Sequence, residues 1–242
     1  MTDTAVCLEN MPLAARRLIG GAAVTLVWTN ELGGQAFRLD GEDGTRYLKW
    51  QQLAGLNPQQ LADVDLLEEK RRLAWAGRFV PVPQVLAGGA ESDGAWLVTA
   101  GIPGENPLAD RWKDDPQVAV PAIARGLRRL HEALPVTDCP FSCRWLDGRL
   151  ADAPEPDLLV VCHGDPCVPN TLLDEHGEAI AHVDLGSLGV ADRWADLALA
   201  SWSIGWDINF GPGYEELFWD AYGVEPDAER ISFYRDLWST ES

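Results

Sequence analysis

Three polar side chains in the second half of the chain have the types and the spacing that phosphoryl transfer requires. Asp165 follows the apolar run 159–162, Asn170 lies five residues further on, and Asp184 follows a second predicted strand. Short apolar runs of this kind are typical of buried strands, so each polar group is expected near a strand end. One carboxylate could orient an attacking hydroxyl group, while an amide and a second carboxylate could hold a divalent cation on the phosphates of a nucleotide.

A simpler interpretation is that Asp165 and Asp184 only form turns where strands end, which is the commoner role of a single aspartate. Three correctly spaced polar groups behind two apolar strands favour the catalytic interpretation instead.

The residues around this set resemble the aminoglycoside phosphotransferases, and most closely the 3'-phosphotransferases. The resemblance rests on His163-Gly164-Asp165 with Asn170, on Val183-Asp184-Leu185-Gly186, and on residues 189–198 with Asp192-Arg193 and Asp196. It implies an α+β, two-lobed protein-kinase-like fold with a small β-rich N-terminal lobe and a mainly helical C-terminal lobe. It also implies an ATP-dependent kinase that phosphorylates a hydroxyl group of a cationic antibiotic, an aminoglycoside above all, and so confers resistance.

The same resemblance gives each member of the set a role. Asp165 is expected to be the catalytic residue that orients and deprotonates the acceptor hydroxyl group, and Asn170 and Asp184 are expected to bind Mg2+. Asp196 is expected to hydrogen-bond the catalytic loop rather than a substrate. ATP and Mg2+ are therefore the expected cofactors.

The N-terminal part of the chain predicts an antiparallel meander, with strands at 23–28, 35–39 and 47–50 between glycine-containing turns. Lys49 lies inside the third strand, where a buried ammonium group needs a partner. By resemblance that partner is Glu69, which would aim Lys49 at the phosphates of ATP, with Glu68 as the neighbouring candidate. Asn57 and Pro58 predict the start of the helix that carries Glu69. The inner face of that helix is predicted to consist of Leu61, Val64 and Leu67.

Residues 96–99 predict a further strand, and residues 100–104, Ala-Gly-Ile-Pro-Gly, predict a linker. We therefore expect an N-terminal nucleotide-binding lobe at 1–100, a hinge linker at 101–104, and a C-terminal catalytic and substrate-binding lobe at 105–242. In the related enzymes the linker binds adenine through its backbone, which implies nucleotide contacts at Thr99 and Gly101.

The C-terminal part predicts mainly helices, from the apolar stripe between Val120 and Leu134, from Asp192 through Ser203, and near 214–222 and 227–238. In the related enzymes, acids from this region bind the amino groups of the drug. The acceptor-binding candidates are accordingly Asp207, Glu215, Glu216 and Asp236. The segment 141–157 is shorter than in the relatives and the C-terminal tail differs from theirs, so the acceptor pocket is expected to be more open on that side.

The charge of the chain is strongly negative, at −19, and unevenly distributed. From Glu105 onward there are 26 acidic and 10 basic residues, whereas residues 1–104 contain 12 and 9. Such a field repels nucleic acid and anionic lipid and attracts cations, which favours a polycationic small-molecule partner. No apolar run approaches the ~20 residues that span a bilayer, and Met1-Thr2-Asp3-Thr4 lacks the basic start of a signal peptide. A cytoplasmic protein, favoured to be a monomer, is expected.

The five cysteines are an odd number, so a complete intrachain disulfide framework is not expected. The spacings Cys139-x3-Cys143 and Cys162-x4-Cys167 differ from the usual zinc patterns. Two other functions stay open from the sequence. One is a kinase for another cationic antibiotic, such as a tuberactinomycin-type cyclic peptide, with small metabolites such as choline or homoserine more distant. The other is a catalytically inactive kinase-like binding protein.

Overall fold

The computed structural model describes residues 13–92 and 94–240. The first four residues, on which the expectation about targeting rests, lie outside this range. Two compact units are present, one comprising the chain up to Gly77 together with Pro83–Ile102, the other comprising Arg78–Val82 and the chain from Pro103 onward. The first unit is built on one antiparallel sheet and the second is mainly helical, in agreement with the predicted α+β class.

The sheet of the N-terminal unit has the strand order β1-β2-β3-β5-β4. Its strands are β1 (Ala23–Thr29), β2 (Gln35–Gly41), β3 (Gly44–Gln52), β4 (Val85–Ala90) and β5 (Gly94–Ala100), and every pairing is antiparallel. The predicted meander and the strand at 96–99 are confirmed. The sequence did not reveal β4, because Gly88 and Gly89 interrupt the alternation of apolar residues that identifies a strand.

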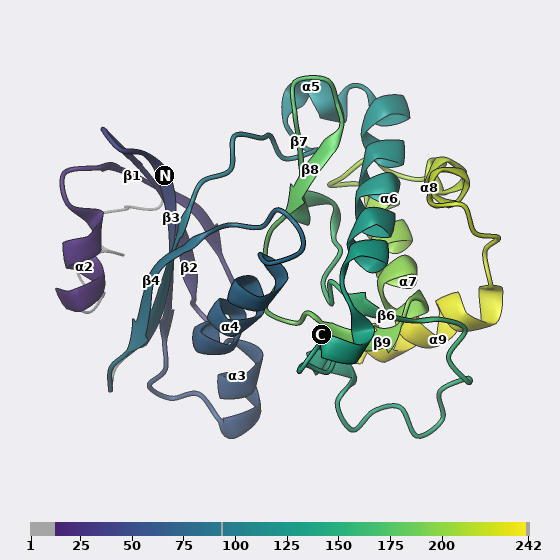
Figure 1. Cartoon of the computed structure of the whole chain (residues 1–242), viewed down its shortest axis with the longest axis horizontal. Helices are drawn as coiled ribbons and strands as arrows, with labels where there is room; N and C mark the ends of the chain where they lie inside the picture. The colour runs from purple at the N-terminus through teal and green to yellow at the C-terminus, as the bar shows by residue number, and fades with distance from the viewer. Residues whose placement is uncertain (1–12, 93, 241–242) are drawn as a thin grey trace. The chain divides into compact units, whose positions relative to one another are not determined.

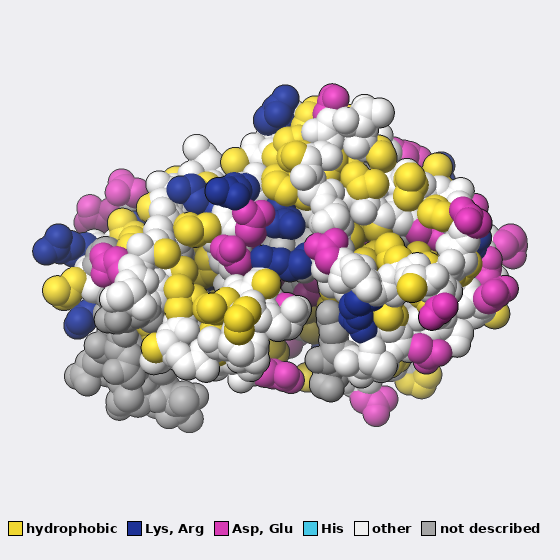
Figure 2. All heavy atoms as spheres, turned by 90° about the horizontal axis from the view of Figure 1, so that it is seen from below, with side chains coloured by type: hydrophobic (Ala, Val, Ile, Leu, Met, Phe, Trp, Pro, Cys, Tyr) yellow, Lys and Arg dark blue, Asp and Glu magenta, His cyan; other side chains and the backbone are white. Residues whose placement is uncertain are grey.

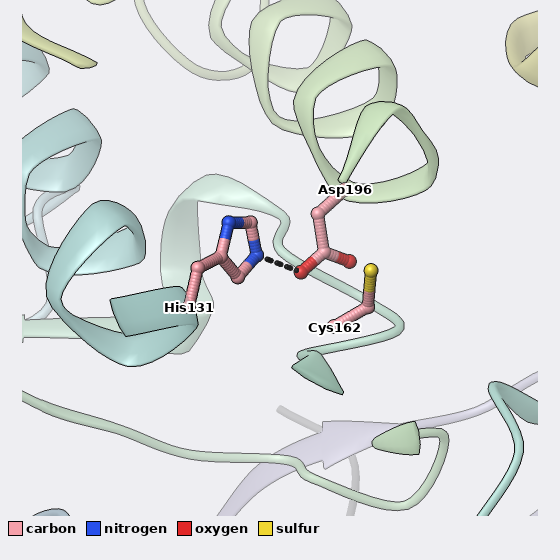
Figure 3. Close-up of side chains that lie close together, drawn as sticks. All are labelled: His131, Cys162 and Asp196. Carbon is pink, nitrogen blue, oxygen red and sulfur yellow. Dashed lines mark hydrogen bonds and ion pairs between the residues drawn. The ribbon is translucent and has the colours of Figure 1, made fainter. Parts of the chain in front are cut away.

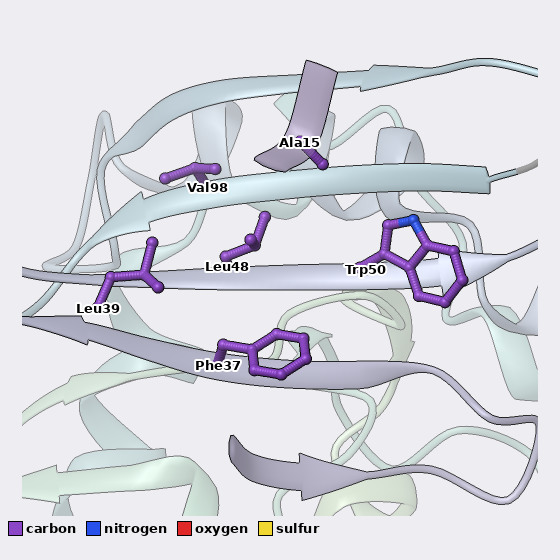
Figure 4. Packing of buried hydrophobic residues seen from close by; sticks show 6 residues of the cluster. All are labelled: Ala15, Phe37, Leu39, Leu48, Trp50 and Val98. Atoms are coloured by element: carbon purple, nitrogen blue, oxygen red, sulfur yellow. The ribbon is translucent and has the colours of Figure 1, made fainter. Parts of the chain in front are cut away.

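One face of this sheet forms the apolar core of the unit. Phe37 pairs with Leu48, which pairs in turn with Val98, so these side chains point to the same side. With Leu39 and Trp50 they pack beneath helix α2 (Leu13–Ile19), whose Ala15 is completely buried (Figure 4). Lys49 lies between Leu48 and Trp50 in sequence and therefore points to the opposite face. Helix α4 (Leu66–Ala76) covers that face (Figure 1).

The prediction of a single helix from Pro58 through Glu69 is wrong. Helix α3 (Pro58–Asp63) starts with the expected cap at Asn57, but α4 is a separate helix capped by Asp65, whose carboxylate accepts hydrogen bonds from the amides of Leu67 and Glu68. This second cap changes which side chains face inward. Leu61 and Leu67, predicted on the inner face, are each 36% exposed, whereas Leu66, Glu69, Arg72, Leu73, Trp75 and Ala76 are buried.

The C-terminal unit contains two short antiparallel strand pairs and five helices within the described range. Strand β6 (Leu159–Cys162) pairs with β9 (Gly189–Asp192), and β7 (Thr171–Leu173) pairs with β8 (Ala179–His182). The helices are α5 (Asp110–Lys113), α6 (Pro116–Ala133), α7 (Trp194–Ile204), α8 (Glu215–Tyr222) and α9 (Ala228–Ser239). The predicted helices are confirmed except that Asp192 ends strand β9 and does not begin α7, because its backbone pairs with Leu159.

Helix α6 packs against α8, and α7 packs against α9. Single turns of 3-10 helix occur at Val136–Asp138, Arg144–Leu146 and Val168–Asn170.

The short segment 141–157 is fastened to the end of helix α9. Trp145 packs edge-on against Tyr234 and Trp238, with ring centroids 6.3 and 5.1 Å apart. Arg149 donates hydrogen bonds to the carbonyl oxygen of Leu237 and to the hydroxyl group of Thr240. These contacts hold the segment in place, although it is short.

The surface of the C-terminal unit carries dispersed acids, as Figure 2 shows on its right-hand side. Among the described residues, none of the helices combines the length and the apolar character needed to span a membrane. The four described cysteines, Cys139, Cys143, Cys162 and Cys167, form no disulfide with one another.

Candidate active site

The turn after strand β6 requires glycine at position 164. Gly164 has a φ of +87°, a region that other residues rarely adopt. A Cβ atom at this position would also lie 2.3 Å from the carbonyl oxygen of Ser187. The backbone at His163-Gly164-Asp165 therefore packs directly against the segment that follows Asp184. Glycine makes this close approach of two strand-end loops possible.

Asp196, in the first turn of α7, holds the backbone of this turn. Its carboxylate is fully buried and accepts hydrogen bonds from the amides of His163, at 2.6 Å, and Gly164, at 2.9 Å. The Nε2 atom of His131 lies 2.9 Å from Oδ2, the same oxygen that accepts from the amide of His163. Burial by itself would raise the pKa of Asp196, but the hydrogen bond with His131 and those from the loop hold that pKa below its ordinary value. Asp196 thus has the expected role of binding the catalytic loop.

Asp165 is held in an unusual environment for a carboxylate. Its amide donates to Nδ1 of His163 at 3.2 Å, and its Oδ1 atom is buried without a hydrogen-bond partner among the described residues. Burial raises the pKa of Asp165, the charge of Asp184 raises it further, and a side-chain hydrogen bond with Cys167 opposes both effects. A buried oxygen without a partner is uncommon and indicates a group that is completed by a ligand.

Asn170 and Asp184 are tied to Asp165 through the backbone. The Nδ2 atom of Asn170 donates to the carbonyl oxygen of Asp165 at 2.9 Å, and the carbonyl oxygen of Asn170 accepts from the amide of Val183. Asp184 is the one non-glycine residue with a positive φ, +64°, within the described range. Backbone strain of this kind persists where the surroundings enforce it, commonly at functional sites.

These two side chains fit a hard divalent cation. Because Nδ2 of Asn170 is engaged with the loop, Oδ1 is the atom that it can offer to a cation, and Asp184 adds carboxylate oxygens. Oxygen ligands of this type, used together with phosphate oxygens, are those that Mg2+ prefers. The assignment of Asn170 and Asp184 to the metal stays a prediction.

Two residues that were not predicted from the sequence, Ser203 and Asn209, stabilise the loop between Asp165 and Asn170. Ser203, near the end of α7, accepts a hydrogen bond from the amide of Val168 at 3.1 Å. Asn209 in turn donates to both oxygens of Ser203. Buried serine and asparagine residues have no spacing that would mark them in a sequence, so only the fold reveals this support.

In the N-terminal unit, Lys49 and Glu69 form the predicted pair. The Nζ atom of Lys49 lies 2.7 and 3.0 Å from the two carboxylate oxygens of Glu69, which is only 5% exposed. Glu68, the alternative partner, instead binds Arg71 and Arg72. The expectation that the pair orients the phosphates of ATP stays a prediction.

The nucleotide contacts predicted at Thr99 and Gly101 lie at the end of strand β5. Thr99 pairs with Tyr47 and Val85 in the sheet. The amide of Gly101 donates to the carbonyl oxygen of Thr45 at 2.8 Å, and a Cβ atom on Gly101 would lie 2.9 Å from that oxygen. Glycine is therefore required at 101 for packing, and its amide is used inside the unit. Contact of either residue with a nucleotide stays a prediction.

The four acceptor-binding candidates differ in their surroundings. Asp207 and Glu216 are exposed. Glu215 lies 3.4 Å from Arg235, so its charge is partly compensated. Asp236 lines a pocket of about 530 Å3 on helices α7 and α9. The other residues of that pocket are Trp202, Pro226, Ala228, Ile231, Ser232, Arg235 and Ser239.

Trp202 and Arg235 were not among the predicted site residues. The guanidinium group of Arg235 lies 6.0 Å from the Trp202 ring and donates to the carbonyl oxygen of Ala198 and the hydroxyl group of Ser201. These contacts keep the positively charged guanidinium group of Arg235 in a pocket that was predicted from the sequence to be acidic.

Comparison with known proteins gives consistent relatives. The model of the phosphotransferase enzyme family matches residues 32–156 and 143–234. The aminoglycoside 3'-phosphotransferase of Streptomyces fradiae is 37% identical over 245 residues, which cover 85% of this chain and 90% of the relative. The streptomycin 3''-kinase of Streptomyces griseus is 37% identical over 257 residues, covering 87% and 89%.

Solved structures agree with these sequences. The aminoglycoside-3'-phosphotransferase of type VIII superposes with a TM-score of 0.75 at 29% identity, over 96% of this chain and 98% of that one. An aminoglycoside phosphotransferase from Streptomyces rimosus, in complex with ADP and streptomycin, superposes with a TM-score of 0.69 at 30% identity, over 98% of both chains.

Proposed function

The chain belongs to the phosphotransferase enzyme family and has its protein-kinase-like fold, and from this premise we propose that it is an ATP-dependent aminoglycoside O-phosphotransferase that confers antibiotic resistance. The observation that carries the proposal is the loop around Asp165. Asp196 fixes the backbone of this loop, and Oδ1 of Asp165 is buried without a hydrogen-bond partner among the described residues. The ADP and streptomycin bound by the Streptomyces rimosus relative support ATP as donor and an aminoglycoside as acceptor. A cytoplasmic location, where ATP is available, is part of the proposal.

In this proposal each residue has one task. Asp165 accepts a hydrogen bond from the acceptor hydroxyl group, orients its oxygen toward the γ-phosphoryl group and takes its proton. Asn170 and Asp184 hold Mg2+, which neutralises charge on the phosphates when it is bound. Lys49, kept extended by Glu69, neutralises further phosphate charge. The raised pKa of Asp165 makes its carboxylate a better proton acceptor than an exposed aspartate.

The pocket that contains Asp236 and Trp202 is the proposed acceptor site. An indole ring offers an apolar face to a sugar ring, and a carboxylate offers an ionic hydrogen bond to an ammonium group. Arg235 limits the negative charge of this pocket, because it compensates Glu215. We therefore propose that the acceptor places an uncharged part of the molecule near Arg235 and its ammonium groups near Asp236 and the exposed acids.

A direct assay of phosphate transfer tests the function. Purified protein is incubated with Mg2+, ATP and a panel of aminoglycosides and tuberactinomycin-type peptides, and the products are identified by mass. Addition of one phosphate to an aminoglycoside is expected. Asp165→Asn keeps the shape of the side chain but removes the base, so turnover should fall at least ~100-fold while ATP still binds. If only the peptides were phosphorylated, the protein would be a kinase for another cationic antibiotic. If ATP bound but no phosphate were transferred, the protein would be an inactive binding protein.

Salt dependence tests the electrostatic part of the proposal. Exposed carboxylates attract through fields that are screened over about 8 Å at physiological ionic strength. The KM of the acceptor should therefore rise as salt is added between low and physiological concentration, while the KM of ATP changes much less. An acceptor KM that does not respond to salt would mean that the acidic surface serves solubility only.

A further inference from the structure

A series of buried hydrogen bonds runs from the last residue of helix α8 to the backbone of the catalytic loop. The hydroxyl group of Tyr222 lies 2.8 Å from Nδ1 of His131, and Nε2 of His131 lies 2.9 Å from Oδ2 of Asp196. Asp196 then accepts from the amides of His163 and Gly164. Tyr222 is 5% exposed, His131 is 6% exposed and Asp196 is fully buried, so water does not compete for these bonds.

The direction of each bond follows from the chemistry of the groups. An ionised carboxylate only accepts, so Nε2 of His131 carries the proton and donates to Asp196. The Nδ1 atom accepts from the hydroxyl group of Tyr222 when the ring is neutral and donates to the hydroxyl oxygen when the ring is protonated, so the contact is satisfied in both forms. Burial raises the pKa of Tyr222 well above its ordinary value, so the phenol keeps its proton. Tyr222 thus fixes the orientation of the His131 ring, and His131 fixes the Asp196 carboxylate.

The same cluster could be mistaken for a metal site, because His131, Cys162 and Asp196 bring their ligand atoms within 4.8 Å of one another (Figure 3). Both nitrogens of the histidine and both oxygens of the aspartate are already hydrogen-bonded. The thiol of Cys162 donates to the carbonyl oxygen of Asp192, and burial raises its pKa well above the ordinary value. The cluster is therefore a structural hydrogen-bond network.

Helix α8 holds Tyr222 firmly in this network. Arg128 of α6 donates to the carbonyl oxygen of Tyr222 at 3.1 Å. Gly223 ends the helix in the left-handed conformation, at φ +82°, and a Cβ atom there would lie 2.9 Å from the guanidinium group of Arg128. The other end of α8 carries Glu215 and Glu216, two of the acceptor-binding candidates. One short helix therefore carries acceptor candidates at its start and the anchor of the catalytic loop at its end.

We propose that His131 and Tyr222 are positioning residues of phosphoryl transfer, which fix the catalytic loop through Asp196 and couple its geometry to the position of helix α8. The inference rests on the proposed function. Both side chains are buried, so loss of either is expected to act through the orientation of Asp165 and to leave Lys49 and Glu69, which are proposed to neutralise the ATP phosphates, unchanged. A misplaced base lowers kcat more than it raises KM.

Tyr222→Phe is the sharpest test, because it removes one hydroxyl group and keeps the ring that stacks on Phe218 at 6.3 Å. We expect kcat to fall about fivefold, the order expected for one buried hydrogen bond, with the KM values of ATP and acceptor within twofold of wild type. His131→Phe should lower kcat further. In the His131→Phe background the Tyr222→Phe change should have no additional effect on kcat, because the series is already broken.

Tyr234→Phe is the matched control. Tyr234 is 2% exposed, and its hydroxyl group interacts with Asp192 at the end of strand β9. This variant should lose comparable stability but keep kcat. An equal kcat in folded Tyr222→Phe and Tyr234→Phe, or a loss confined to KM, would overturn the inference.

Hydrogen exchange separates this inference from the proposed function, since it requires no acceptor. The amides of His163 and Gly164 should exchange faster in Tyr222→Phe than in wild type or in Tyr234→Phe. Unchanged exchange would overturn the positioning role whatever the substrate is. Faster exchange in a protein that phosphorylates no aminoglycoside would leave the network established and the proposed function wrong.

Discussion

Replacement of Gly164 by alanine should affect both stability and catalysis, and the structure allows the two causes of instability to be separated. A non-glycine residue in the left-handed region costs about 1–2 kcal/mol. The added Cβ atom would lie 2.3 Å from the carbonyl oxygen of Ser187, a backbone atom that can move only with its segment. Forcing an extra carbon into a packed site costs typically about 1–3 kcal/mol. The free energy of unfolding of Gly164→Ala should thus fall by about 2–5 kcal/mol.

Gly148→Ala is the control for backbone conformation alone. Gly148 has a φ of +75°, but a Cβ atom there would meet no atom within 4 Å. Its free energy of unfolding should fall by only about 1–2 kcal/mol. Both values can be measured by urea unfolding, and the difference between the variants isolates the contact with Ser187. The expected loss corresponds to a fall in melting temperature of roughly 2–4 °C per kcal/mol for a chain of this size.

Activity gives the second readout. Relief of the clash must separate the loop of Asp165 from the segment that follows Asp184, and a displacement of about 1 Å can cost 100-fold in rate. We expect kcat of Gly164→Ala to fall at least ~100-fold at a temperature where the protein is folded, and kcat of Gly148→Ala to stay at the wild-type value. Equal stability and equal activity of the two variants would refute the reasoning.

Three further predictions concern other parts of the molecule. Glu69→Gln should raise the KM of ATP and lower kcat roughly tenfold or more, because hydrogen bonds to charged groups are worth about 1.5–3 kcal/mol. Steady-state kinetics should show no such effect for Glu68→Gln, because the partners of Glu68 are arginines. Asp184→Asn should abolish Mg2+-dependent nucleotide binding in calorimetry without altering the circular dichroism spectrum, and normal binding would remove it from the metal site. The free energy of unfolding should decline as pH rises above about 10, because tyrosines ionise there in the unfolded chain, whereas burial keeps the pKa of Tyr234 higher in the folded state. Urea unfolding at a series of alkaline pH values should show a weaker decline for Tyr234→Phe.

The sequence was sufficient for those parts of the site that depend on local strand ends or on charge compensation. The cost of an ammonium group inside an apolar strand predicted only that Lys49 has a partner. The family resemblance favoured Glu69 over Glu68, and Glu69 is the partner. Asp165 and Asp184 closely follow the short strands β6 and β8, which were recognisable as apolar runs, and Asn170 ends the 3-10 turn Val168–Asn170 that lies between them. Asp196 was expected at the catalytic loop and binds it there.

The sequence did not reveal features whose local pattern was ambiguous or that depend on contacts between distant residues. Two capping residues, Asn57 and Asp65, lie eight positions apart, and the sequence pattern did not reveal that the second starts a new helix. Strand β4 was missed because glycines hide its alternation, although pairing with β5 fixes its conformation. The roles of Ser203 and His131 depend on groups 35 and 65 residues away, and such contacts leave no local pattern.

The strand order of the N-terminal sheet has a consequence for synthesis of the protein on the ribosome. Strand β5 is the last of the five to be made, yet it lies between β3 and β4. Until residues 94–100 have emerged, β4 has no neighbour and β3 presents an open edge next to the apolar side chains of Leu48 and Trp50. Open apolar edges readily pair with other chains. A translational pause before residues 94–100 have left the ribosome exit tunnel should therefore favour aggregation of the nascent chain, whereas a pause after they have left it should be harmless.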